Sequence, residues 1–176
     1  MIKEGVALIK WFEGFRSDPY IDAAGVATIG FGSTYREDGN RVTMDHPPIT
    51  QDQAERLLMR EVKVAELAVA RLISVPLTPE QSAALGSFTY NLGSGALQRS
   101  TLRQRLNRGD YDAVFEEFPK WRMAGGRVLA GLVRRRQEEI KLWSGGNQVA
   151  RQPKPSSSAE VSFLLSWLWP QWLRRR

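Results

Sequence analysis

The sequence contains no cysteine, and His46 is its only histidine. Disulfide bonds, thiolate nucleophiles and cysteine-based metal sites are therefore excluded, and so is a zinc site built from several histidines. A Ser-His-Asp triad would depend on His46, which precedes two prolines in a stretch typical of a loop. Catalysis by this chain must rest on other side chains, and carboxylates are the leading candidates.

Long hydrophobic runs are also missing from the N-terminal segment. Only four consecutive apolar residues, 6–9, separate Gly5 from Lys10. Such a run is too short for the core of a signal peptide or for a membrane span. We therefore expect no export signal, and folding in the cytoplasm of the cell that makes the chain.

The charge is unevenly distributed along the chain. The formal net charge is +6, which favours an anionic partner such as a nucleic acid, a phospholipid surface or an acidic polymer. Residues 151–176 hold five Lys or Arg and one Glu, so this C-terminal stretch carries most of the excess. Elsewhere basic and acidic residues are interleaved, and no known nucleic-acid-binding motif is present. We therefore expect no nucleic-acid partner.

The N-terminal residues predict a short helix with a carboxylate at its end. Val6, Ile9 and Phe12 recur at helical spacing, which indicates a helix that buries one side. Gly14 is a typical residue for ending a helix, so Glu13 should lie at the helix terminus. This carboxylate would then sit beside whatever the helix packs on.

Extended segments broken by glycine-containing turns follow between residues 19 and 44. Asp38-Gly39 predicts a hairpin turn, and Asp22 begins an earlier turn with the sequence DAAG. In VATIGFG, the alternation of a strand would place Val26, Thr28, Gly30 and Gly32 on one face. That face would be small and partly polar, which lets a ligand approach the backbone closely. A poorly packed edge hairpin would have the same pattern.

Helix starts mark the next part of the chain. Thr50 and Gln53 form a capping-box pattern ahead of a helix over 51–72, which would span about 33 Å at a rise of about 1.5 Å per residue. A second start of the same kind is expected at Thr78, with Pro79 in the first helical position. A helix as long as the first can connect two lobes.

Shorter helices are expected further along. The sequence predicts a start at Ser100 and stops at Gly109 and at Gly125–Gly126. The arginine run at 134–136 has the pattern of a solvated helix surface, with the first arginine paired to Glu138.

Together these elements predict an α+β fold that is mainly α. A small N-terminal lobe with β-hairpins (about residues 1–50) would be joined by the connecting helix (about 51–72) to a larger all-helical C-terminal lobe (about 78–145). Clefts between two lobes are common binding sites. The carboxylates of the first lobe would flank such a cleft.

The stretch EGFRSDPYIDAAGVATIGFGST resembles the signature of phage-type lysozymes, the endolysins of glycoside hydrolase family 24. The resemblance continues through SFTYNLGSGAL, STLRQRLNRGDY and KWRMAGGRVLAGLVRRRQEEIKLW, and so covers about residues 1–145. It implies a lysozyme-like catalytic domain over 1–146. It also implies an endolysin that hydrolyses the β-1,4 bond between N-acetylmuramic acid and N-acetylglucosamine in bacterial peptidoglycan, so that the host cell lyses.

The family signature places its Glu, Asp and Thr at Glu13, Asp22 and Thr28 of this chain. Glycoside hydrolysis needs a protonated acid for the leaving oxygen and an ionised group for the positive charge and the water. A shielded Glu13 suits the general acid because desolvation favours its neutral form, whereas Asp22 in a wetter turn should stay ionised. Thr28 would share the nucleophilic water with Asp22, which resembles an inverting mechanism. This chemistry requires no metal or organic cofactor.

Substrate contacts are expected where the chain resembles the family's cleft positions, at Gly32, Thr34, Tyr90 and Thr101. For Tyr90 a place on a helix face, and for Thr101 a place beside a helix cap, are equally good interpretations.

The C-terminal residues depart from the family pattern. Residues 147–160, within GGNQVARQPKPSSSAE, have the Gly, Pro and Ser content of a flexible linker. Residues 161–176, VSFLLSWLWPQWLRRR, hold three of the six tryptophans and end in three arginines. This composition suits contact with an anionic membrane or lipopolysaccharide surface, and the run is too interrupted to span a bilayer. A strap packed on the lysozyme body and an appended peptide are the alternatives.

The remaining expectations concern partners and location. We expect a monomer that binds peptidoglycan. The resemblance implies that the protein waits in the host cytoplasm until a holin-made lesion releases it to the cell wall. The alternative to an enzyme is a non-catalytic cell-wall-binding or membrane-disrupting protein on the same fold.

Overall fold

The computed structural model describes residues 1–22 and 25–145 of the chain. The predicted linker at 147–160 and the predicted cationic tail at 161–176 lie outside the described residues. None of the helices in the described ranges is both long enough and apolar enough to cross a membrane.

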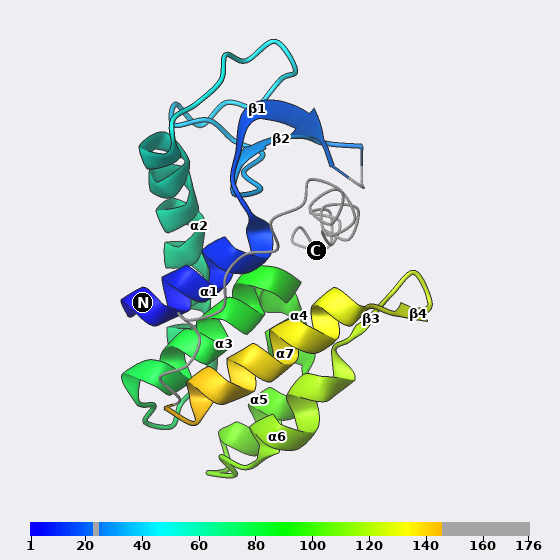
Figure 1. Ribbon diagram of the computed structural model, residues 1–176. Helices are drawn as coiled ribbons and strands as arrows, with labels where there is room; N and C mark the ends of the chain where they lie inside the picture. The colour runs from blue at the N-terminus through cyan, green and yellow to red at the C-terminus, as the bar shows by residue number, and fades with distance from the viewer. Residues whose placement is uncertain (23–24, 146–176) are drawn as a thin grey trace.

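The protein is mainly α-helical and carries a small β-hairpin at one end (Figure 1). The hairpin and its loops form one lobe, the shorter helices form the other, and the longest helix runs from one lobe to the other. This arrangement confirms the predicted α+β, mainly α class. The elements in chain order are α1 (Lys3–Glu13), β1 (Arg16–Ile21), β2 (Ala27–Gly30), α2 (Gln51–Leu72), α3 (Pro79–Leu92), α4 (Ser94–Arg99), α5 (Thr101–Leu106), α6 (Ala113–Glu117), the 3-10 helix η1 (Phe118–Lys120), β3 (Met123–Ala124), β4 (Arg127–Val128) and α7 (Ala130–Trp143).

The two predicted capping boxes both form. At the start of α2, Thr50 Oγ1 accepts from the Gln53 backbone N–H at 3.2 Å, and Gln53 Oε1 accepts from the Thr50 N–H at 2.8 Å. Thr78 and Gln81 make the same pair of contacts ahead of α3, where Pro79 takes the first helical position. Because each box satisfies two backbone donors that a helix start leaves unpaired, local sequence alone fixes where these helices begin.

Strands β1 and β2 form an antiparallel hairpin in which Tyr20 pairs with Thr28. The predicted common face does not extend to Gly32. Gly30 has φ +67° and Gly32 has φ +93°, so the chain leaves the strand and turns back. A Cβ at Gly30 would lie only 2.9 Å from the Ala54 Cβ, which shows how closely this turn packs on α2.

Two other turns differ from their predictions. Around Asp38-Gly39 the predicted hairpin is reduced to a single bridge between Tyr35 and Arg41. Gly125–Gly126 does not end a helix. Both glycines have positive φ, and they form the two-residue turn between β3 and β4, so the second lobe is not entirely helical.

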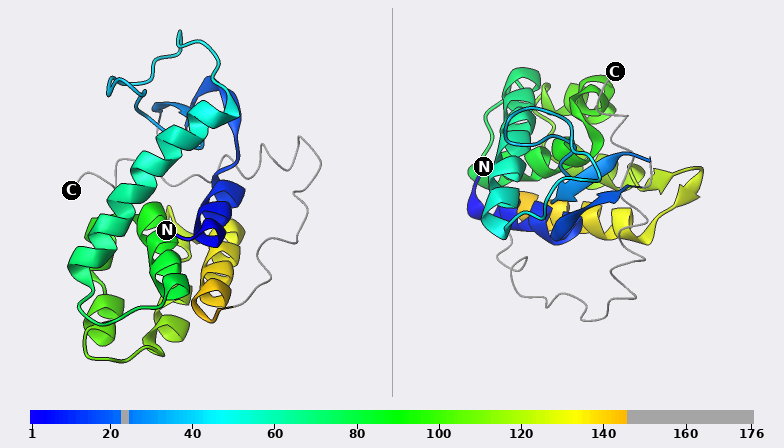
Figure 2. Two further views of the ribbon diagram at one scale, coloured as in Figure 1. Left: turned by 90° about the vertical axis from the view of Figure 1, so that its left-hand side faces the viewer. Right: turned by 90° about the horizontal axis from the view of Figure 1, so that it is seen from above.

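Each lobe has its own hydrophobic cluster, and α1 contributes to both. Leu8 belongs to the cluster of the helical lobe, whereas its neighbour Ile9 belongs to the cluster under the hairpin. Helix α2 likewise gives Val62 to the second cluster and Val69 to the first. Both helices therefore contribute to both lobes, and α1 ends where the chain passes from the helical lobe into β1 (Figure 1). The left view of Figure 2 shows α2 running from one lobe to the other.

Candidate active site

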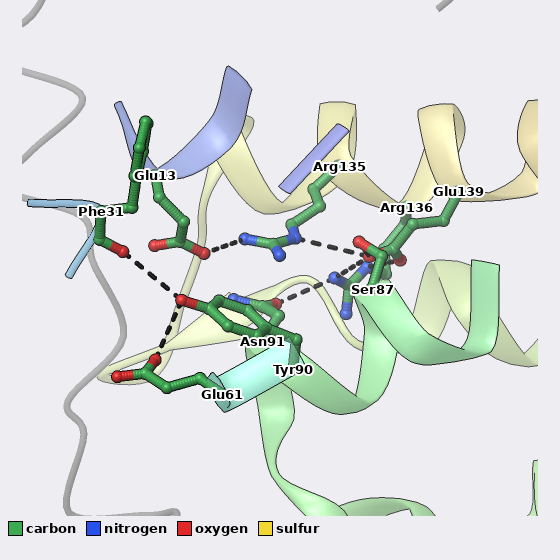
Figure 3. Close-up of polar contacts among 9 residues, drawn as sticks. All are labelled: Glu13, Phe31, Glu61, Ser87, Tyr90, Asn91, Arg135, Arg136 and Glu139. Carbon is green, nitrogen blue, oxygen red and sulfur yellow. Dashed lines mark hydrogen bonds and ion pairs between the residues drawn. The ribbon is translucent and has the colours of Figure 1, made fainter. Parts of the chain in front are cut away.

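Glu13 is the last residue of α1 and lies at the junction of the two lobes. Gly14 ends the helix with φ +66°, and the Glu13 side chain turns inward, so that the residue is only 3% exposed. Arg135 of α7 donates from Nη1 to Glu13 Oε1 at 2.7 Å (Figure 3). A buried carboxyl and a buried guanidinium therefore form an ion pair at this junction.

The Arg135 contact corrects the prediction made for the arginine run. Arg134 is exposed as expected, but Arg135 and Arg136 are buried. Glu138 contacts Lys141 Nζ at 2.6 Å rather than the first arginine of the run. The prediction failed because α7 packs against both α1 and α3, so that two of the three arginines face protein.

Behind Arg135 lies a buried ionic cluster. Glu139 is fully buried, and its Oε1 accepts from Ser87 Oγ at 2.8 Å, from Arg136 Nη2 at 3.0 Å and from Arg135 Nε at 3.4 Å. Arg136 also donates to Asn91 Oδ1 at 2.9 Å. Figure 3 shows these side chains in one row from Glu13 to Ser87.

Burial and pairing act in opposite directions on this cluster. Burial lowers the pKa of Arg136 to about 10, and the carboxylate of Glu139 opposes that decrease. Burial raises the pKa of Glu139, and Arg136 and then Arg135 oppose that increase. Burying an unpaired charge would cost on the order of several kcal/mol. The contacts among Arg135, Arg136 and Glu139 provide the pairing that reduces this cost.

Asp22 lies at the turn of the β1–β2 hairpin and Thr28 lies in β2, and both contact the backbone of Val26. Asp22 Oδ1 accepts from the Val26 backbone N–H at 2.8 Å, and Thr28 Oγ1 donates to the Val26 carbonyl at 3.0 Å. Asp22 is half-buried, whereas Thr28 is buried. A hydroxyl that donates to a carbonyl can still accept a hydrogen bond from a water.

Tyr20 connects the two carboxylates electrostatically. Its pKa is raised mainly by burial, then by the charge of Glu13, and also by Asp22, while Arg16 opposes the increase. The phenol is therefore within electrostatic reach of both acids. Tyr20 itself lies in β1, two residues before Asp22 and opposite Thr28 of β2.

The residues expected to contact substrate lie in two places. Gly32 and Thr34 are buried in the loop after β2, close to α3, because the Tyr90 hydroxyl lies 3.4 Å from the Phe31 carbonyl oxygen. That hydroxyl also donates to Glu61 Oε2 at 3.1 Å. Thr101 instead occupies the first position of α5, where it is exposed and follows the cap.

A small pocket opens beside the Tyr90 contact. It has a volume of about 280 Å³ and is lined by Ser33, Tyr35, Glu61 and four further residues. Among residues 1–22 and 25–145, no group of three or more His, Asp or Glu side chains is arranged to hold a metal ion.

Sequence reasoning missed Tyr20, Arg135 and Glu139 as parts of this site. A signal for the last two was present in the helical spacing. Both fall on the stripe that also carries Leu132 and Leu142, so charged residues occupy positions that an amphipathic helix buries. Charged residues are seldom buried without a partner, so this pattern indicates mutual pairing.

The chain is similar to known proteins in both sequence and structure. A family model described as phage lysozyme matches residues 10–139. An endolysin of Salmonella phage P22 is 37% identical over 140 residues, which cover 80% of this chain and 95% of that protein. The solved structure of an endolysin from Escherichia coli O157:H7 phage FAHEc1 has a TM-score of 0.74 and 37% identity, and covers 81% of this chain and 91% of that one.

A longer relative matches over part of its length. An endolysin of Bacillus phage B103 is 40% identical over 159 residues, which are 88% of this chain but 59% of that protein. The chain therefore spans about three-fifths of that relative.

Proposed function

The chain belongs to the phage lysozyme family, and we propose that it is an endolysin that hydrolyses the β-1,4 bond between N-acetylmuramic acid and N-acetylglucosamine. Membership makes it a lysozyme-type glycoside hydrolase with peptidoglycan as its substrate. The observation that carries the proposal is Glu13, a buried carboxyl at the junction of two lobes that is hydrogen-bonded to Arg135. A second carboxylate, Asp22, lies on the neighbouring hairpin turn in a wetter setting.

The proposed roles follow from these two environments. Glu13 gives its proton to the bridging oxygen as the bond from that oxygen to the anomeric carbon of N-acetylmuramic acid breaks. A water held by Asp22 and Thr28 attacks the same carbon from the opposite face and passes a proton to Asp22, which inverts the configuration. Arg135 then holds the carboxylate that the proton has left, and exchange with solvent restores both acids.

Loss of turbidity of purified peptidoglycan tests this proposal. Glu13→Gln keeps the shape and a hydrogen-bond acceptor for Arg135 but removes the proton donor. We expect its rate to fall by about a thousand-fold or more. Glu4→Gln, on the same helix α1 but at its other end, is the control and should keep the wild-type rate. A lytic Glu13→Gln variant would contradict the assignment, and an inactive wild type that binds peptidoglycan would favour a non-catalytic wall-binding protein.

The cationic tail carries a separate part of the proposal. Residues 161–176 combine three tryptophans with three terminal arginines, a composition that binds the interface of anionic membranes or lipopolysaccharide. The arginines contribute about 1 kcal/mol each on such a surface, and this contribution weakens with salt. Deleting residues 150–176 should leave hydrolysis of isolated peptidoglycan nearly intact while reducing binding to anionic vesicles. Vesicle binding that persists, or a truncated protein that no longer folds, would refute the membrane role.

Location and assembly complete the proposal. The protein accumulates as a monomer in the host cytoplasm and reaches the cell wall through a holin-made lesion. Fractionation of cells that express it with and without a co-expressed holin tests the location and the route of release, because lysis should require the holin. Lysis by the chain alone would show another route of export. Sedimentation of the purified protein tests whether it is a monomer.

A further inference from the structure

The strongest unexplained feature of the molecule is the number of charges buried behind the catalytic acid. Glu13, Arg135, Arg136 and Glu139 are each at most 3% exposed. They come from two helices, and Ser87 of α3 closes the row. Only Glu13 and Arg135 have a role in the proposed chemistry, and burying the charges of Arg136 and Glu139 is costly unless they serve a purpose.

Arg135 links Glu139 to the proposed catalytic acid, Glu13. Its guanidinium reaches Glu13 with Nη1 and Glu139 with Nε, and its cationic centre lies 5.3 Å from the centre of the Phe12 ring. Arg135 is therefore held between two carboxylates and over one aromatic ring. Removing Glu139 would leave Glu13 as its only carboxylate partner among the described residues.

The net charge of the cluster formed by Glu13, Arg135, Arg136 and Glu139 also depends on Glu139. With Glu13 ionised, two guanidiniums face two carboxylates, and the cluster is neutral. With Glu13 protonated, as the general acid must be, the cluster has one positive charge in excess. Without Glu139 that excess would be two, so a proton on Glu13 would be harder to retain.

We propose that Glu139 is a positioning residue for the catalytic acid, which fixes Arg135 and offsets the charge of both arginines so that Glu13 can keep its proton. This inference rests on the assignment of Glu13 as the general acid. It extends that assignment to a buried carboxylate that does not touch the substrate.

The other titratable groups around Glu13 are the same in every variant compared below. Arg135 reaches it from α7, and Tyr20 faces it from β1. Burial raises the pKa of Tyr20, so the phenol stays protonated in the pH range in which a lysozyme is assayed. Arg16 and Asp22 act on Tyr20 from the same hairpin and are present in every variant compared below.

The test is the pH dependence of peptidoglycan hydrolysis in three variants. Glu139→Gln removes a buried negative charge, so we expect the alkaline limb of the profile to move to lower pH by about one unit. Arg136→Met removes a buried positive charge and should move the same limb to higher pH. The double variant has the wild-type excess of one charge, and its limb should return close to that of the wild type.

The control is Glu138→Gln, which removes the neighbouring carboxylate on the other side of α7, where it contacts Lys141. Its profile should coincide with that of the wild type. A purely structural role for Glu139 predicts lower activity at every pH with an unmoved limb. Limbs that coincide in all variants, or that move in the same direction, overturn the proposal.

Two further outcomes remain informative. If Glu139→Gln does not fold, the shift of Arg136→Met to higher pH still tests the proposal, because an unmoved limb there overturns it. If Glu13→Gln keeps lytic activity, the proposed function fails and the profiles no longer report on Glu13. Failure of the function and failure of this inference are therefore distinguishable.

Discussion

The two carboxylates of the candidate site are held in opposite ways. Glu13 is buried at the junction of the lobes, where the Arg135 side chain of α7 holds it. Asp22 lies at a half-buried turn, where the backbone N–H of Val26 holds it. The first contact joins residues 122 positions apart, and the second joins residues four positions apart.

This difference matches the chemistry proposed for each group. A general acid must carry its proton near neutral pH, which burial promotes, and its carboxylate must then be tolerated after the proton has left. A carboxylate that holds water must stay ionised and accessible, which a hairpin turn allows. The comparison implies that mutations behind Glu13 act through folding and proton affinity together, whereas mutations at the turn act on catalysis.

Removing the buried arginine that holds Glu13 should have the largest effect on stability. Arg135→Ala leaves two buried carboxylates, Glu13 and Glu139, with one fewer counter-charge. We expect the free energy of unfolding to fall by about 3–5 kcal/mol. Urea denaturation measures it. Arg134→Ala, at the exposed neighbouring position, should change it by less than about 0.5 kcal/mol. Equal effects at the two positions would show that burial of Arg135 does not matter for stability.

A double-mutant cycle on the rate of hydrolysis tests whether Asp22 and Thr28 of the hairpin act together. Asp22→Asn and Thr28→Ala should each slow the reaction, with Asp22→Asn losing about a hundred-fold or more. Because both residues contact Val26 and hold one water in the proposed mechanism, the double variant should be little worse than the worse single variant. Losses that multiply would argue against a shared water. Urea curves for the three variants check that folding is retained.

The smallest effect is expected where the helical lobe meets the loop after β2. Tyr90→Phe removes a hydroxyl that contacts Glu61 and the Phe31 carbonyl. We expect a loss of about 1 kcal/mol in the free energy of unfolding. Tyr111→Phe, which removes a hydroxyl that donates to the Pro76 carbonyl on an exposed part of the chain, is the matched control and should cost less. A larger loss for Tyr111→Phe than for Tyr90→Phe would contradict the expected contribution of the buried hydroxyl.

The parts of the fold that local chemistry decides could be predicted from the sequence. Thr50 and Thr78 start their helices where the capping boxes require, and Gly14 ends α1. The prediction that the strand face extends to Gly32 was wrong, because an alternating pattern does not reveal that Gly30 and Gly32 adopt positive φ. The Gly125–Gly126 turn failed for a related reason, since a glycine pair can end a helix or turn a hairpin.

Burial of charge was the harder part of the site to predict. Helical spacing places Arg135 and Glu139 on the buried stripe of α7, but it does not identify their partners outside that helix. Glu13 and Ser87 lie 122 and 52 residues from them, respectively. Glu13 itself could be located from the helix end and the family signature. Its partner could not, because a contact between α1 and α7 depends on how the whole helical lobe packs.

The central claim is that Glu13 acts as the proton donor, and a change of leaving group tests it most directly. An oligosaccharide that carries 2,4-dinitrophenol at the scissile position needs no proton on its leaving oxygen, whereas peptidoglycan does. The account predicts that Glu13→Gln loses about a thousand-fold or more on peptidoglycan but less than about ten-fold on the activated substrate. An equally large loss on both substrates, in a variant that folds normally, would contradict it.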